Sequence, residues 1–151
     1  MSKSAEWELV KKWMHQKTVV PSDMTVKNVA EIMVARNVGS VIVSIGGKES
    51  GMLTERDILR KVISKGLDPS KIMAAEVMTS PLRTISEDAT IWDAADFMST
   101  HNIRRLPVTD SKGEIVGVLT TRMISNALPI ISRMELSTQL KSTLDRMKHN
   151  D

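Results

Sequence analysis

The sequence predicts an α/β fold built from two copies of one strand–helix–strand–strand–helix unit. The first observation is internal similarity, because the segment that starts at Val19 matches the segment that starts at Thr84, with Asp, Thr, Ala, Met and Asn recurring 65 residues apart. The second observation is that each copy combines a helical stripe of apolar residues with short β-branched runs. Each copy therefore forms one layered supersecondary unit that needs a neighbour to bury its apolar face.

A threonine directly precedes the apolar stripe in each copy, Thr25 in the first and Thr90 in the second. Threonine is a favoured N-cap residue, so we expect a helix with one buried face to begin after each of them. The stripes are Val26, Val29, Ala30, Met33 and Val34 in the first copy and Ile91, Ala94, Ala95 and Met98 in the second.

Two strands and a second helix are predicted after each stripe. The strands lie around 41–43 and 51–53 in the first copy and around 106–108 and 115–119 in the second, with turn signals between them. Gly51 and Gly117 are 66 residues apart, so the second turn holds one more residue. The second helices are expected to bury Ile58, Leu59, Val62 and Ile63 in the first copy and Met123, Ile124 and Ala127 in the second, where Pro129 ends or kinks the helix.

Apolar stripes outside the repeats predict a helix at each end of the chain. They are Trp7, Val10, Trp13 and Met14 at one end and Leu136, Leu140, Leu144 and Met147 at the other. We expect them to pack onto the repeats or onto another copy, and a groove for a partner protein is the alternative. The predicted organisation is an N-terminal helix in 1–17, repeats in 18–75 and 76–128, and a C-terminal helix in 129–151.

Composition limits the classes of function. The chain has no cysteine, which excludes disulfides and thiolate metal sites, and no window reaches the length of about 18 apolar residues that a membrane span needs. Without a secretory leader pattern, we expect a soluble, cytoplasmic protein that does not contact membranes. A net charge of only +3, with no Tyr and one Phe, disfavours nucleic-acid binding.

No catalytic constellation is visible in the sequence. His15 and His149 lie in the terminal segments and His101 lies at a helix end, so no histidine has a clustered partner. We therefore expect neither an enzyme nor a metal site.

The duplicated motifs resemble the CBS domain pair, the family named after cystathionine β-synthase. The resemblance covers roughly residues 18–128 and rests on the segments 51–57, 77–81, 88–90 and 103–108, in that order. It implies two repeats about a pseudo-two-fold axis, with clefts that bind AMP, ADP, ATP or S-adenosylmethionine as regulatory ligands and no obligatory cofactor. It also implies a homodimer through the helices and an unidentified regulated protein.

Thr54 and Asp57 form the predicted centre of the principal site. Thr54 lies between a predicted strand and a predicted helix, so free backbone N–H groups at the helix start would attract a phosphate. Asp57 would present its carboxylate to ribose hydroxyls. Gly51 is small enough for a ligand or the neighbouring repeat to approach. The same Thr-x-x-Asp spacing also fits a capping box that only closes the helix end. Spacing leaves both readings open, and the resemblance favours ligand contact.

The resemblance also implies which residues complete the two sites. An arginine of the pair 104–105 would take the phosphate, and adenine would lie against the linker between the repeats. The principal site comprises Gly51, Thr54, Arg56, Asp57, Met78, Pro81, Thr84, Ile85, Arg104, Arg105 and Pro107. The second comprises Thr18, Val19, Val20, Ser40, Ile42, Thr120, Arg122 and Met123. Because Met123 stands where the family has Asp, we expect this second site to be weak, empty or differently occupied.

Two functions follow from these features. The first is a regulatory module that binds an adenosine-containing ligand without catalysis. The alternative is a ligand-independent module for homodimerisation or assembly, which recruits a partner protein through its terminal helices.

Overall fold

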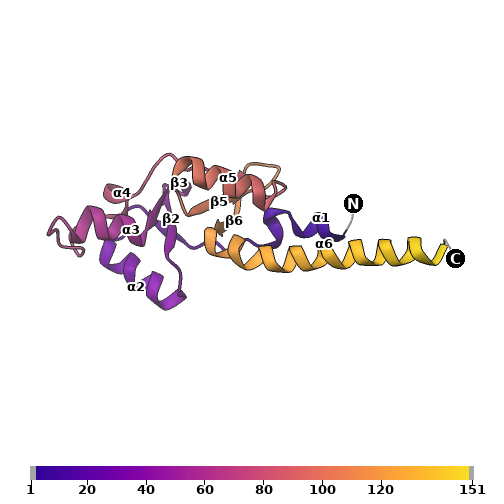
Figure 1. The fold of residues 1–151 in the computed structure, drawn as a ribbon. Coiled ribbons are helices and arrows are strands. Elements are labelled where there is room, and N and C mark those ends of the chain that lie inside the picture. Colours follow the sequence, from indigo (N-terminus) through magenta and orange to yellow (C-terminus); the bar gives the residue numbers. More distant parts are fainter. Residues whose placement is uncertain (1–2, 150–151) are drawn as a thin grey trace. The chain divides into compact units, whose positions relative to one another are not determined.

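The computed structural model describes residues 3–149, which form two compact α/β units (Figure 1). The first-repeat unit is Gln16–Arg83, and the second-repeat unit joins the residues from Thr84 onward to the N-terminal segment that ends at His15. Each unit has one three-stranded sheet, so the predicted fold class and the order strand, helix, strand, strand, helix are confirmed.

The first-repeat unit contains a sheet of order β1-β2-β3. Its elements are β1 (Val19–Pro21), α2 (Val26–Arg36), β2 (Ser40–Ile45), β3 (Lys48–Thr54), α3 (Glu55–Ile58), the π-helical turn η2 (Leu59–Ile63) and α4 (Ala74–Val77). β1 pairs with β2 in parallel, and β2 pairs with β3 antiparallel. The helix α2 thus connects β1 to β2, and a tight turn connects β2 to β3.

The second-repeat unit repeats this topology with a sheet of order β4-β5-β6. Its elements are α1 (Lys3–Trp7), the 3-10 turn η1 (Val10–Lys12), β4 (Ile85–Ser86), α5 (Ile91–His101), β5 (Arg105–Thr109), β6 (Ile115–Thr120) and α6 (Thr121–His149). The turn between β5 and β6 is longer than that between β2 and β3, as the change in sequence offset predicts.

The caps of α2 and α5 explain the repeated Thr and Asn residues. The hydroxyl oxygen of Thr25 accepts a hydrogen bond from the Asn28 amide at 3.3 Å, and Thr90 begins α5 in the same way. Asn37 and Asn102 end the two helices in the left-handed conformation, at φ 53° and 51°. Asn tolerates this conformation better than most residues, so its recurrence marks the two helix ends.

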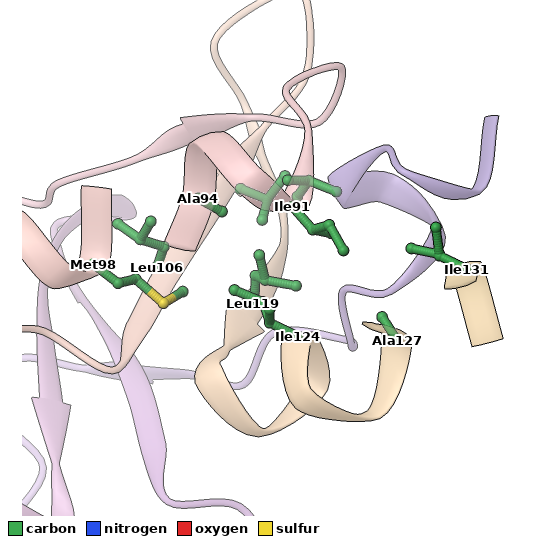
Figure 2. Packing of buried hydrophobic residues seen from close by; sticks show 10 residues of the cluster. Ile91, Ala94, Met98, Leu106, Leu119, Ile124, Ala127 and Ile131 are labelled. Atoms are coloured by element: carbon green, nitrogen blue, oxygen red, sulfur yellow. The ribbon is translucent and has the colours of Figure 1, made fainter. Parts of the chain in front are cut away.

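Each unit has its own apolar core, and most of each core occupies equivalent positions in the two repeats (Figure 2 shows the second). The cores are Val20, Val26, Val29, Met33, Val41, Val43, Leu53, Val62, Ala74 and Val77, and Val10, Ile91, Ala94, Met98, Leu106, Val108, Leu119, Ile124, Ala127 and Ile131. Three predicted core residues are instead exposed, since Val34, Leu59 and Ile63 have 82%, 61% and 52% of their surface accessible. The apolar stripe on each of these two helices is wider than the helix face that packs against the sheet.

The N-terminal segment is not the single helix predicted for 1–17. It forms two short turns whose chain then pairs with β6, where the amides of His15 and Val118 donate to each other's carbonyl oxygens at 2.9 and 3.0 Å. Gly117 permits this approach, because a Cβ there would lie 2.8 Å from the His15 carbonyl oxygen. The segment therefore belongs to the second-repeat unit rather than standing apart from both repeats.

In the first-repeat unit, residues 72–79 dock against the last strand as the N-terminal segment does in the second-repeat unit. The amide of Ala74 donates to the Met24 carbonyl at 2.8 Å, as that of Val10 donates to Ala89 at the same distance in the other unit. The predicted boundary between residues 75 and 76 therefore does not separate the two packed units, which divide between Arg83 and Thr84.

In α6, of the two predicted effects of Pro129, an end of the helix is wrong, and so is a separate helix in 129–151, of which residues 150–151 lie outside the described part. The helix runs unbroken from Thr121 to His149. Ala127 and Ile131, on either side of Pro129, are both buried in the core, so packing holds the helix together where proline removes one backbone hydrogen bond. No helix within residues 3–149 is long and apolar enough to cross a membrane.

Substituting Gly117→Ala should lower the free energy of unfolding by about 1–3 kcal/mol, because the new methyl group forces the His15 main chain away from β6. Urea denaturation of the variant beside the wild type measures this. In a strand without the contact, Gly to Ala would leave stability unchanged or raise it. Either of those results would contradict the docking of the N-terminal segment.

Candidate functional site

The centre of the candidate site is a capping box at the end of β3. The Asp57 amide donates to the Thr54 hydroxyl oxygen at 3.2 Å, and the Thr54 amide donates to Asp57 Oδ2 at 3.0 Å. The Thr54 hydroxyl also lies 3.1 Å from the same carboxylate oxygen. One oxygen of Asp57 is thus used to close the start of α3, which is the capping reading of the Thr-x-x-Asp spacing.

The other carboxylate oxygen of Asp57 faces two groups that sequence reasoning did not include. The Thr79 hydroxyl donates to Asp57 Oδ1 at 3.3 Å, and the Lys61 ammonium forms an ion pair with it at 3.1 Å. Lys61 also donates to the Val77 carbonyl at 2.9 Å and to Thr79 Oγ1 at 3.4 Å. The sequence signal for Lys61 is its spacing of four residues from Asp57, which places the two on one helix face.

Two expectations about this turn are wrong. The Glu55 and Asp57 amides are not free for an anion, because the Glu55 amide donates to the Gly39 carbonyl at 3.1 Å and the Asp57 amide donates to the Thr54 hydroxyl oxygen. The carboxylate is not presented to solvent either, since only 13% of the Asp57 side chain is exposed. A ligand that reaches this carboxylate must therefore replace contacts that the protein already makes.

Gly51 has a structural role in the same place. A Cβ there would lie 2.9 Å from Met78 Cγ and 3.1 Å from the Thr79 carbonyl oxygen, and Met52 and Thr79 exchange two main-chain hydrogen bonds of 2.8 and 3.0 Å. The close neighbour of Gly51 is thus the segment that also supplies Thr79 to Asp57. Gly51, Thr54, Asp57 and Met78 are brought together within the first-repeat unit.

Comparison with known proteins decides the family. The sequence profile described as "CBS domain" matches residues 10–64 and 74–130. The chain belongs to the CBS domain family. An uncharacterized protein of Methanopyrus kandleri is 33% identical over 109 residues, which cover 71% of this chain. The chain spans about half of that relative, 55% of its length.

Two solved CBS structures share the fold and contain adenosine compounds. A CBS domain protein of Pyrobaculum aerophilum complexed with AMP gives a TM-score of 0.72 at 26% identity, covering 83% of this chain and 98% of that one. The CBS domain pair of MJ0100, in complex with 5′-methylthioadenosine and S-adenosylmethionine, gives 0.71 at 28% identity, covering 80% and 95%.

The remaining residues of the predicted principal site divide between the two units. Arg56 and Pro81 are exposed on the first CBS unit. Thr84, Ile85, Arg104, Arg105 and Pro107 belong to the second CBS unit, where Arg104 is exposed and Pro107 is buried. A site that combines Asp57 of the first unit with Arg104 or Arg105 of the second stays a prediction.

The second predicted set is divided in the same way, with Thr18, Val19, Val20, Ser40 and Ile42 in the first CBS unit and Thr120, Arg122 and Met123 in the second. Strand pairing sets Ser40 beside Thr54 and Arg105 beside Thr120, each within its own unit. Ser40, predicted for the second site, therefore lies beside Thr54 of the principal set, and Arg105, predicted for the principal site, lies beside Thr120 of the second set.

Burial and capping also distinguish the members of the second set. Thr18, Val20, Ser40 and Ile42 are buried, whereas Val19 and Arg122 are exposed. Thr120 still caps α6, because its hydroxyl oxygen accepts from the Met123 amide at 3.2 Å, but Met123 has no carboxylate to return the bond. The Met123 position therefore lacks the polar network found at Asp57.

Removing the two cap hydroxyls should have unequal effects. Thr54→Val removes both hydroxyl contacts with Asp57 and should cost about 1–2 kcal/mol of unfolding free energy, whereas Thr120→Val removes one bond and should cost less than about 1 kcal/mol. Chemical denaturation of the two variants compares them directly. Equal losses would show that the contact between the Thr54 hydroxyl and the Asp57 carboxylate adds nothing.

Proposed function

We propose that this CBS chain is a regulatory module that binds an adenosine-containing ligand, namely AMP, ADP or ATP, and does not transform it. The observation that carries the proposal is the Asp57 carboxylate, which is held in a fixed orientation beside Gly51 and the Met78–Thr79 segment. A carboxylate of this kind accepts hydrogen bonds from both ribose hydroxyls. The AMP and S-adenosylmethionine found in the similar structures supply the ligand class.

The two oxygens of Asp57 have different availability to a ligand. Oδ2 is bound to the Thr54 main chain, and losing that bond would open the start of α3. Oδ1 is bound to the side chains of Lys61 and Thr79, which rotate at little cost because both residues reach the surface. Ribose hydroxyls would replace these side chains at Oδ1 while the cap stays intact.

Asp57→Ala should reduce the stabilisation by adenine nucleotides to about half or less. A ligand at a hundred times its Kd adds about 2.7 kcal/mol to stability, which raises Tm by several degrees. Loss of hydrogen bonds to a charged acceptor weakens binding by about ten- to a hundredfold. A thermal-shift panel of AMP, ADP, ATP and S-adenosylmethionine measures both proteins.

Asp93→Ala is the matched control for this panel. Asp93 forms the same capping box with Thr90 at the start of α5, so its removal has the same cost for a helix end but leaves the candidate site unchanged. The control should keep the full ligand-induced shift. A wild type that none of the four compounds stabilises, or equal loss of the shift in both variants, would contradict the proposed function.

The second candidate function is assembly through α6. From Glu135 onward the described residues of α6, whose course Figure 1 shows, are exposed, and apolar residues recur at helical spacing among them. Leu136, Leu140, Leu144 and Met147 are each more than half exposed, at 59%, 57%, 54% and 61%. An apolar stripe of this kind is typical of a helix that associates with another chain.

Leu140→Glu with Leu144→Glu should lower the molar mass in solution if α6 forms the homodimer, because two charges would enter an apolar contact. Light scattering coupled to size exclusion measures the mass, with Lys141→Glu as a control for the added charge. An unchanged mass would exclude α6 as the self-association surface.

A further inference from the structure

Lys61 connects three parts of the candidate site through one ammonium group. Its Nζ lies 3.1 Å from Asp57 Oδ1, 2.9 Å from the Val77 carbonyl oxygen and 3.4 Å from Thr79 Oγ1. The side chain is still 40% exposed, so the ammonium can turn toward a bound molecule without leaving a buried position. Lys61 is therefore the described cation that touches the Asp57 carboxylate.

The second CBS unit lacks the acid and the base together. At the offset of 66 residues, Met123 takes the place of Asp57 and Ala127 takes the place of Lys61. The π-helical turn η2 adds one residue to the helix of the first repeat, so buried Ala127 matches buried Val62 in the packed units and Asn126 matches Lys61; neither Ala127 nor Asn126 is basic. The acid and its lysine thus occur as a pair in one repeat and are absent as a pair in the other.

The pair sets the local charge that a ligand meets. Without Lys61, Asp57 would leave a net negative charge that attracts cations and repels phosphate. With Lys61 the pair is neutral, and once ribose hydroxyls occupy Oδ1 the ammonium is released beside the ligand. In adenosine compounds the group on the 5′ carbon lies next to the ribose, so it is the part of the ligand whose charge matters there.

We propose that Lys61 is a specificity-determining residue of the Asp57 site, which favours adenosine ligands with an anionic 5′ group over the cationic sulfonium of S-adenosylmethionine. This inference rests on the proposed function, because it assumes that the ribose binds Asp57. Beyond the proposed function, this inference states that the site prefers nucleotides such as AMP to other adenosine compounds. It assigns the charge selection to the first CBS unit alone, independently of any arginine in the second.

Calorimetric titration of AMP, adenosine and S-adenosylmethionine into Lys61→Met tests the proposal. The Kd for AMP should rise by about tenfold, a change expected for loss of one charge-assisted contact. Adenosine should change by less than about threefold, and S-adenosylmethionine should bind as well as before or more tightly, because a repelling charge is removed. Lys61→Arg keeps the charge and should keep the preference for AMP.

Two further variants separate charge from structure. Lys61→Gln keeps a hydrogen-bond donor for the Val77 carbonyl and should behave like Lys61→Met, so the test does not depend on one variant folding. Lys65→Met removes an exposed lysine four residues further on and should leave all three affinities unchanged.

The outcomes distinguish the two proposals. If the wild type binds none of the three compounds, the proposed function fails and this inference fails with it. If the wild type binds AMP but the Lys61 variants weaken all three ligands in parallel, or leave AMP unchanged, the proposed function stands and the charge selection is overturned. Loss of AMP preference in Lys61→Arg would overturn it as well.

Discussion

Each unit depends on the close approach of a second main-chain segment to a glycine in its last strand. Gly51 meets Met78–Thr79 and Gly117 meets Met14–His15, and in both places a single Cβ would lie too close to main-chain or side-chain atoms. The approach lets both segments exchange two main-chain hydrogen bonds with the strand. It also brings Ala74 and Val10 into equivalent positions in the two cores. The core of the first repeat is therefore completed by residues 72–79, which follow that repeat in the chain, and the core of the second by the N-terminal segment, which precedes the first repeat.

The same contact supports chemistry in only one of the two units. In the first CBS unit it places the Thr79 hydroxyl and the Val77 carbonyl beside Asp57 and Lys61. In the second unit the equivalent segment pairs with the equivalent strand, but Met123 stands in place of the acid and no lysine follows it at the position of the base. The sheet and the docking of this segment are therefore shared, while the polar network is a property of the first repeat. The backbone also differs here, because a π-helical turn follows Asp57 whereas α6 is an α-helix.

The sequence predicted the local features of the fold well and the long-range ones poorly. Thr25, Thr90 and the two left-handed Asn residues act within a few residues of themselves, so their repetition identifies both helices. The pairing of His15 with Val118 joins residues about a hundred positions apart, and an apolar stripe from Trp7 to Met14 fits a helix equally well. At Pro129 the local expectation that proline ends a helix fails, because Ala127 and Ile131 on both sides of it are buried in the core.

The candidate site was predicted at Thr54 and Asp57 with capping and ligand contact as competing readings; the structure shows the capping box, and ligand contact at the other carboxylate oxygen stays a proposal. Oδ2 caps α3 and so fixes the carboxylate before a ligand arrives, which reduces the ordering that binding must supply. In the proposed complex, two ribose hydroxyls would replace the Thr79 hydrogen bond and the Lys61 ion pair at Oδ1, so the gain at this oxygen would be small. Removal of the carboxylate is different, because the ribose hydroxyls would then be desolvated without a partner. Under the proposed function, Asp57 would select ligands that carry the ribose diol, and net affinity would come from the adenine and the 5′ group.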